Sequence, residues 1–130
     1  MNNTSELLNL AKSASKNAHA PYSNFYVGAA ILSDSNEFYA GCNVENIAFP
    51  VGTCAEAGAI ASMVANGDKK IKEILIYASS QELITPCGAC RQRIAEFGDS
   101  QTLVHLADDE GVKKTLSIEE LLPYTFKDIS

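Results

Sequence analysis

The chain has 130 residues, 46% of them hydrophobic and 20% charged, which is typical of one globular domain spanning residues 1–130. Its 16 acidic and 10 basic residues give a formal net charge of −6, and this excess of acid argues against a binder of nucleic acid or another polyanion. No apolar run reaches the roughly 18 residues that cross a bilayer, and the first residues do not resemble a signal peptide. We therefore expect a cytoplasmic protein that acts on a small molecule.

The first half of the chain predicts a helix followed by a hairpin. Apolar residues at helical spacing indicate an amphipathic helix over residues 5–18, which Pro21 ends. Two strands are expected over residues 25–32 and 37–43, and the turn at residues 34–36 joins them.

The second half alternates helices with buried strands. Thr53 is expected to cap a helix, with Glu56 completing a capping box three residues later and the helix ending near Gly67. The later elements are a strand over 71–79, a helix from Thr85–Pro86 to Phe97–Gly98, strands over 102–107 and 112–116, and a short helix capped by Ser117 and Glu120. This order fits a three-layer α/β/α fold around a mixed five-stranded sheet.

Three of the four cysteines have the spacing of a metal site. Cys54 precedes Glu56 by two residues, and Cys87-x-x-Cys90 follows later in the chain. Three thiolates leave one position of a tetrahedral zinc ion open for water, as in a catalytic site, and Glu56 could handle the protons of that water. Cys54 and Cys87 also fall at predicted helix N-termini, where the helix dipole favours thiolates.

Other interpretations of these residues exist. Glu56 alone could be only a capping residue, and Cys87-x-x-Cys90 could be a redox pair, although Cys54 would then have no role. Cys42 is expected to be a small core residue, and His105, inside an apolar strand, a hydrogen-bonded core histidine.

The sequence resembles the small, homotetrameric cytidine deaminases of the three-cysteine zinc type. The zinc nucleobase deaminases share the pattern of a His or Cys, x-Glu and Pro-Cys-x-x-Cys. Four further segments resemble the family in order along the chain, and they are residues 20–30, 41–46, 85–92 and 119–123. The resemblance covers nearly the whole chain and implies the cytidine deaminase fold with one zinc per chain.

The resemblance also implies a reaction. Cytidine and deoxycytidine would be hydrolysed to uridine and deoxyuridine in pyrimidine salvage, with zinc hydroxide attacking C4 and Glu56 carrying protons to N3 and the leaving amine. The backbone N–H groups of Ala55 and Cys87 would contact the base carbonyl and the zinc-bound oxygen. The carbonyl of Thr85 would lie near the leaving amine.

The same resemblance assigns nucleoside contacts. Asn43 and Glu45 would hold the ribose hydroxyls, and their alternation along an extended segment puts both on one face. Phe25 would stack on the pyrimidine. Phe49 and Phe126 would close the pocket of a neighbouring subunit in a homotetramer. Without the resemblance, all five would be taken as surface or core residues.

One position departs from the family. Many three-cysteine members have an arginine directly after the catalytic glutamate, where it hydrogen-bonds the thiolates, whereas this chain has Ala57. Zn²⁺ with three thiolates carries a formal charge of −1, which would make the bound water less acidic. Arg91, directly after Cys90, is the expected replacement.

Two other functions stay open. Blasticidin-S-type deaminases share the zinc motifs, but Glu45 favours a substrate with ribose hydroxyls. A non-catalytic, zinc-stabilised interaction domain would need a fourth protein ligand, for which Cys42 is the only spare thiol. The sequence does not decide between ribo- and deoxyribonucleosides.

Overall fold

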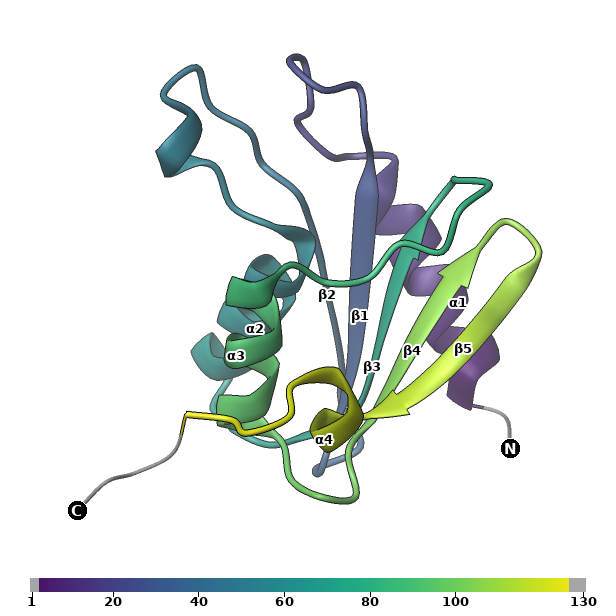
Figure 1. The fold of residues 1–130 in the computed structure, drawn as a ribbon, viewed down its shortest axis with the longest axis vertical. Helices are drawn as coiled ribbons and strands as arrows, with labels where there is room; N and C mark the ends of the chain where they lie inside the picture. Colours follow the sequence, from purple (N-terminus) through teal and green to yellow (C-terminus); the bar gives the residue numbers. More distant parts are fainter. Residues whose placement is uncertain (1–2, 127–130) are drawn as a thin grey trace.

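A five-stranded sheet forms the middle layer of the computed structural model, which describes residues 3–126 (Figure 1). The helices are α1 (Asn3–Ser15), α2 (Ala55–Ala65), α3 (Gly88–Phe97) and α4 (Ile118–Leu121), with a 3₁₀ turn, η1, at Phe49–Val51. The strands are β1 (Val27–Ser33), β2 (Phe38–Cys42), β3 (Ile71–Ala78), β4 (Leu103–Asp108) and β5 (Gly111–Ser117). Within these residues, no helix combines the length and apolar character needed to cross a membrane.

The strand order is β2-β1-β3-β4-β5, and β3 and β4 are parallel while the other neighbouring pairs are antiparallel. The mixed five-stranded sheet and the β1–β2 hairpin are therefore confirmed. The parallel pair is connected through α3, in the manner of a crossover between parallel strands.

Two apolar layers cover the sheet, one on each face. The alternation of a β-strand sends Ile74 and Ile76 of β3 toward α2 and α3, and Leu75 and Tyr77 toward α1. Helix α1 packs Leu7 and Ala11 on its side of the sheet. This arrangement confirms the predicted three-layer α/β/α architecture.

The helix starts at the site differ from the prediction. Helix α2 has Cys54 as its N-cap, without a side-chain cap, because Thr53 instead pairs through its backbone N–H and C=O with Val44 at 2.9 Å each. Helix α3 has Cys87 as its N-cap, so Pro86 lies before the helix rather than in its first turn. Both helices thus begin with a cysteine in extended conformation.

Other local predictions were closer. The first helix ends at Ser15 rather than residue 18. The Ser117–Glu120 capping box of α4 is present with both of its hydrogen bonds. His105 is a hydrogen-bonded core residue as expected, with its two ring nitrogens 2.8 Å from Thr115 Oγ1 and Glu73 Oε1.

A glycine on β2 sets how closely α2 approaches the sheet. A Cβ atom at Gly41 would lie 2.3 Å from the backbone nitrogen of Ala59 and 2.7 Å from the carbonyl oxygen of Ala55, distances that real side chains do not reach. The absence of a side chain at Gly41 therefore lets the first turns of α2 lie directly on β2. This contact sets the position of the first turns of α2, and with them Cys54 and Glu56, on this face of the sheet.

Candidate active site

Three cysteine sulfurs form one cluster where α2 and α3 begin. The Sγ atoms of Cys54, Cys87 and Cys90 lie within 4.8 Å of one another, and Cys54 and Cys87 are 3.8 Å apart. Cys54 and Cys87 are the N-caps of their helices, whereas Cys90 lies in the first turn of α3 and is fully buried. The predicted metal ligands are therefore brought together by the fold.

The cluster fits a zinc ion in ligand type and in spacing. A tetrahedral zinc with Zn–S bonds of about 2.3 Å holds its sulfurs about 3.8 Å apart, which matches the Cys54–Cys87 distance. Cys42, the fourth cysteine, lies on β2 outside this group. The donors within residues 3–126 are thus three sulfurs, and a bound ion would keep a position for a further ligand.

The pKa values of the three clustered thiols shift in different directions. Burial, together with the charges of Glu56 and Cys54, raises the pKa of the Cys90 thiol well above its usual range. Burial also raises the pKa of Cys54. The pKa of Cys87 is lowered: burial alone would raise it, but hydrogen bonds from the backbone N–H groups of Cys90 and Ala89 and from the Cys54 side chain outweigh that effect. Metal coordination deprotonates thiols, so an ion bound here would release protons.

Glu56 lies beside the sulfurs as a buried carboxyl group in the first turn of α2. Only 4% of its surface is exposed. Burial raises the pKa of the Glu56 carboxyl, an effect that the positive charge of Arg93 partly opposes. A carboxyl group with a raised pKa is suited to accept and donate a proton in one turnover.

A pocket of ≈ 310 Å³ opens over this cluster. Its lining includes five of the expected substrate residues, two of the three clustered cysteines and the carboxyl group, and these residues are Phe25, Asn43, Glu45, Ala55, Thr85, Cys54, Cys87 and Glu56. The rest of the wall consists of residues to which the sequence gave no substrate or metal role, and these are Val27, Val44, Gly52, Thr53, Ile76 and Ile84. In the sequence they are ordinary strand and loop residues, so nothing local indicated that they would line a pocket.

The two expected ribose contacts are fixed by the loop before β1. Asn43 Oδ1 accepts from the backbone N–H of Val27 at 2.9 Å, and its Nδ2 donates to the carbonyl oxygen of Phe25 at 2.8 Å. Glu45 accepts from the backbone N–H groups of Tyr22 and Ser23 at 3.0 and 3.2 Å, and also from the Ser23 hydroxyl. These hydrogen bonds lower the pKa of Glu45, the Ser23 hydroxyl most of all, so this side chain is a carboxylate.

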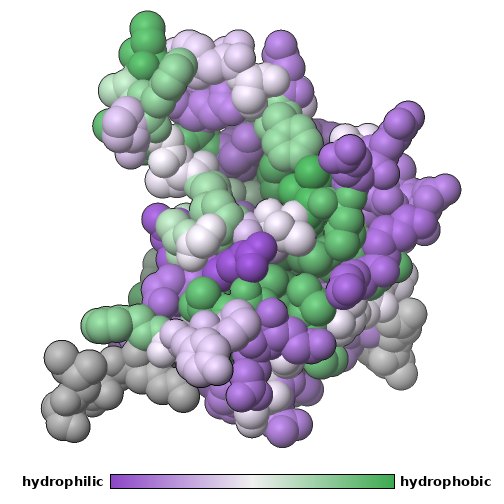
Figure 2. Space-filling model, viewed as in Figure 1, coloured by the Kyte–Doolittle hydropathy of each residue, from purple (hydrophilic) through white to green (hydrophobic). Residues whose placement is uncertain are grey.

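Phe49 lies outside the pocket that contains the cysteines. It is 73% exposed and packs edge-on against Tyr22 in a neighbouring hollow of ≈ 350 Å³. Figure 2 shows apolar residues at the end of this projecting segment, where Ile47 and Val51 are also exposed. Within one chain, Phe49 therefore does not line the pocket above the three cysteines.

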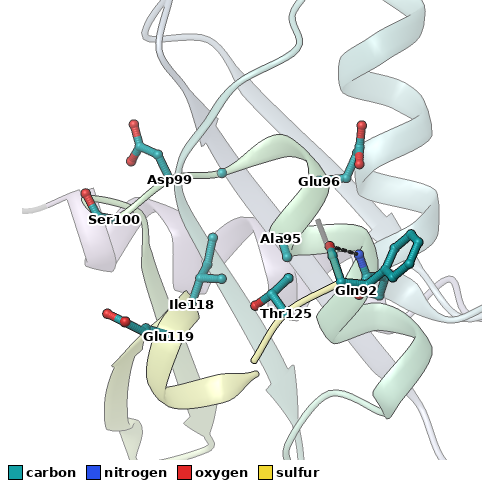
Figure 3. A pocket seen from close by; sticks show the side chains of 10 residues that line it. Gln92, Ala95, Glu96, Asp99, Ser100, Ile118, Glu119 and Thr125 are labelled. Carbon is teal, nitrogen blue, oxygen red and sulfur yellow. Dashed lines mark hydrogen bonds between the residues drawn. The ribbon is translucent and has the colours of Figure 1, made fainter. Parts of the chain in front are cut away.

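Phe126 is also separate from the cysteine pocket and 76% exposed. It lines a different hollow of ≈ 390 Å³ between α3 and α4, where Gln92 Nε2 lies 3.5 Å from its carbonyl oxygen (Figure 3). Three carboxylates, those of Glu96, Asp99 and Glu119, surround this hollow.

Arg91 does not contact the sulfurs, which corrects the expectation from the sequence. Its guanidinium donates to the carbonyl oxygens of Pro86 at 2.9 Å and Leu121 at 2.8 Å, and to Thr85 Oγ1 at 3.2 Å. Instead, Arg93 Nη1 donates to Cys90 Sγ at 3.3 Å. Residues three apart on a helix share a face, whereas adjacent residues do not, so the spacing from Cys90 could have indicated Arg93.

The comparisons agree with this geometry. Residues 1–106 match the family profile described as the cytidine and deoxycytidylate deaminase zinc-binding region. The chain is 38% identical over 121 residues to a cytidine deaminase of Sporosarcina psychrophila, covering 93% of this chain and 89% of that protein. It is 42% identical over 113 residues to a cytidine deaminase of Mycoplasma genitalium, covering 86% of each.

A solved structure gives the same result for the fold. The crystal structure of cytidine deaminase from Burkholderia pseudomallei superposes with a TM-score of 0.89 at 38% identity, covering 94% of this chain and 98% of that one. The sequence matches, the shared fold and the cluster of three cysteines beside a buried glutamate lead to one conclusion. The chain belongs to the cytidine deaminase family of enzymes.

Proposed function

We propose that the protein hydrolyses cytidine and deoxycytidine to uridine and deoxyuridine, with release of ammonia, and that it serves pyrimidine salvage. The observation that carries the proposal is the buried Glu56 beside three clustered cysteine sulfurs, with Glu56 and two of the cysteines, Cys54 and Cys87, lining one pocket. The named activity of the relatives, all described as cytidine deaminases, supports the same substrate class.

The proposed cofactor is one zinc ion per chain, held by Cys54, Cys87 and Cys90. Zinc would lower the pKa of a bound water from about 15.7 toward about 7, so that this water can attack C4 of the base at neutral pH. The sulfur spacing and the three-donor set support zinc over a hard cation, which prefers oxygen ligands.

Glu56 is the proposed proton carrier. Its carboxylate would take a proton from the attacking water and deliver it to N3 of the ring. It would then take the remaining proton from the new C4 hydroxyl and pass it to the amine, so that the bond from C4 to nitrogen breaks, ammonia leaves and a carbonyl group remains at C4. Burial of Glu56 supports this role, because it raises the pKa of the carboxyl group, and a carboxyl group with a raised pKa is better able to donate a proton as well as accept one.

The nucleoside would lie in the ≈ 310 Å³ pocket with its base toward Glu56. Phe25 would stack on the pyrimidine, and Asn43 and Glu45 would bind the ribose hydroxyls. Both polar side chains are already held by backbone groups of residues 22–27, so binding would cost little further ordering. The backbone N–H of Ala55 and the carbonyl of Thr85 would contact the base and the leaving amine.

We also propose a homotetramer in which Phe49 and Phe126 enter the pockets of neighbouring subunits. Both rings are exposed and lie away from the cysteine pocket of their own chain. Exposed apolar residues gathered on one projecting segment are characteristic of a protein interface. Residues 1–130 would form one catalytic domain per subunit.

The cysteine chemistry favours a reducing compartment. Three free thiols close enough to form disulfides bind metal only while reduced, so the cytoplasm is the proposed location. The acidic net charge of −6 is consistent with a free nucleoside as substrate rather than a polynucleotide.

The proposal is tested by following the ultraviolet absorbance of cytidine and of deoxycytidine in the presence of purified protein whose zinc has been counted. We expect turnover with about one zinc per chain. Glu56→Gln should keep the zinc and the fold but lower turnover by about 10²–10⁴-fold, while Glu82→Gln, an exposed charge-matched control, should match the unaltered protein.

The same samples separate the alternatives. A zinc-loaded protein that leaves both nucleosides unchanged but consumes blasticidin S would replace the proposed substrate with the antibiotic. A protein that binds zinc and deaminates none of the three compounds would contradict the enzymatic proposal and support a zinc-stabilised interaction domain.

A further inference from the structure

The guanidinium group of Arg93 in α3 contacts the cysteine cluster. Arg93 Nη1 lies 3.3 Å from Cys90 Sγ, within hydrogen-bonding distance of a sulfur acceptor. Among the residues that the structure describes, no other cationic side chain is recorded with a hydrogen bond to one of the three sulfurs.

A zinc ion held by three thiolates carries a formal charge of −1, and the neighbouring Glu56 carboxylate would bring the site to −2. Cys90 and Glu56 are both buried, with 0% and 4% of their surfaces exposed. Buried negative charge without a partner is costly, because the surrounding protein solvates it much less well than water does. The site therefore needs a nearby cation in the metal-loaded state.

The other helix of the site supplies no such cation. Helix α2 reads AEAGAIASMVA from Ala55 to Ala65 and contains no lysine or arginine. The Arg91 guanidinium already donates hydrogen bonds to the carbonyl oxygens of Pro86 and Leu121 and to the hydroxyl of Thr85. Arg93 remains the cation that reaches the cluster, approaching the buried sulfur from the exposed side of α3.

We propose that Arg93 is the positioning residue that compensates the charge of the three-thiolate site and retains the metal in it. The inference rests on the proposed zinc site. Arg93 acts through Cys90 rather than on the substrate, since it does not line the nucleoside pocket. Its permanent charge and its hydrogen bond would hold the Cys90 sulfur in its ligating position and stabilise it as a thiolate.

The test compares Arg93→Gln and Arg93→Lys with Lys113→Gln, which removes the same charge from an exposed position on β5. Zinc affinity is measured by competition with a chelator, without substrate. We expect Arg93→Gln to bind zinc about 10–100-fold more weakly. Arg93→Lys should recover part of this loss, and Lys113→Gln should equal the unaltered protein.

Three further readouts separate this role from a purely structural one. The melting temperature of Arg93→Gln should fall for the zinc-loaded protein and stay unchanged for the metal-free protein, because the charge is needed only when thiolates are present. With Co²⁺ in place of zinc, the sulfur-to-metal charge-transfer absorption should move to longer wavelength as the thiolate loses its positive neighbour. In cytidine turnover, kcat should fall while KM changes little.

Equal zinc affinity in Arg93→Gln and the unaltered protein would overturn the inference, as would equal destabilisation of the metal-free and loaded forms. In either case, zinc binding by the unaltered protein would leave the proposed function standing. An unaltered protein that binds no zinc would overturn both the inference and the proposed function.

Discussion

The sulfur atoms of Cys54 and Cys87 lie 3.8 Å apart although 33 positions separate them in the sequence. Each cysteine is the N-cap of its helix, and the two helices begin next to each other, since the sulfurs of the cluster lie within 4.8 Å of one another. The first turns of α2 and α3 therefore act as one unit, and a change to either helix start should affect the metal cluster.

Replacing a cluster cysteine should remove the metal, whereas replacing the fourth cysteine should not. We expect Cys87→Ser to lose nearly all zinc and turnover, because a neutral hydroxyl is a far weaker ligand than a thiolate. Cys42→Ser, a half-buried position outside the cluster, should keep about one zinc per chain. Zinc counting on both purified variants checks this. Metal loss from Cys42→Ser would instead make Cys42 a fourth ligand and the site a structural one.

A methyl group at Gly41 should displace the helix that carries Cys54 and Glu56. Its Cβ would meet the backbone of α2 at 2.3 Å, and backbone atoms cannot move away without shifting the helix. We expect Gly41→Ala to lower the free energy of unfolding by about 2–3 kcal/mol and to reduce zinc content. Urea unfolding and zinc counting measure the two effects.

Gly58→Ala is the matched control on the other side of the same contact. Its Cβ would have its closest neighbour, the Cys42 carbonyl oxygen, at 3.5 Å, an ordinary contact distance. Because alanine favours a helix interior over glycine by up to about 1 kcal/mol, Gly58→Ala should keep or raise stability. Equal losses in both variants would show that packing between α2 and β2 tolerates no added methyl group, and the special role of Gly41 would be refuted.

The Asp68 carboxylate should make stability depend on pH in the acid range. It accepts hydrogen bonds from Tyr39 at 2.5 Å, Ser35 at 2.7 Å and Ser33 at 3.0 Å, and these bonds lower its pKa in the folded state. A lowered folded pKa means that the stabilisation is complete above the unfolded value of about 3.9 and is lost as pH falls through the folded value. The same contact raises the pKa of Tyr39 to about 12.

Asp68→Asn tests this dependence. Unfolding in urea between neutral pH and about pH 2 should give a stability difference from the unaltered protein that is largest at neutral pH and disappears in acid. Taking the difference between the two proteins removes the effect of metal release in acid, which both share. A difference that stays constant across this range would mean that the carboxylate charge contributes nothing.

Removing Arg91 should destabilise the segment before α3 and have little direct effect on the cysteine cluster. Its guanidinium ties Thr85 and Pro86 to the carbonyl of Leu121 in α4. We expect Arg91→Ala to lower the free energy of unfolding by about 2 kcal/mol, the scale for hydrogen bonds from a charged group, and to reduce turnover because Thr85 lines the pocket.

The comparison with Arg93→Gln makes this prediction specific. Arg91→Ala should weaken zinc binding less than Arg93→Gln, since only Arg93 contacts a sulfur. Chelator competition on the two variants gives the ratio directly. If Arg91→Ala released zinc more readily, Arg91 would be the partner of the thiolates, as the sequence had led us to expect.

The sequence by itself determined the elements whose signals are local. Alternation and helical spacing predicted the mixed sheet, the β1–β2 hairpin and the three layers, because each element carries its own period of apolar residues. The spacing of Cys54, Cys87 and Cys90 indicated the metal cluster, since ligand type restricts the chemistry before any coordinates are known.

Tertiary structure alone decided which neighbours these residues have. Thr53 pairs with Val44 instead of capping α2, and Arg91 donates to the Leu121 carbonyl oxygen in α4 instead of to a sulfur. Gly41 is required by a helix that begins 14 positions later. These outcomes depend on contacts between distant segments, whose energies are similar for several candidate partners, so the local sequence cannot select among them.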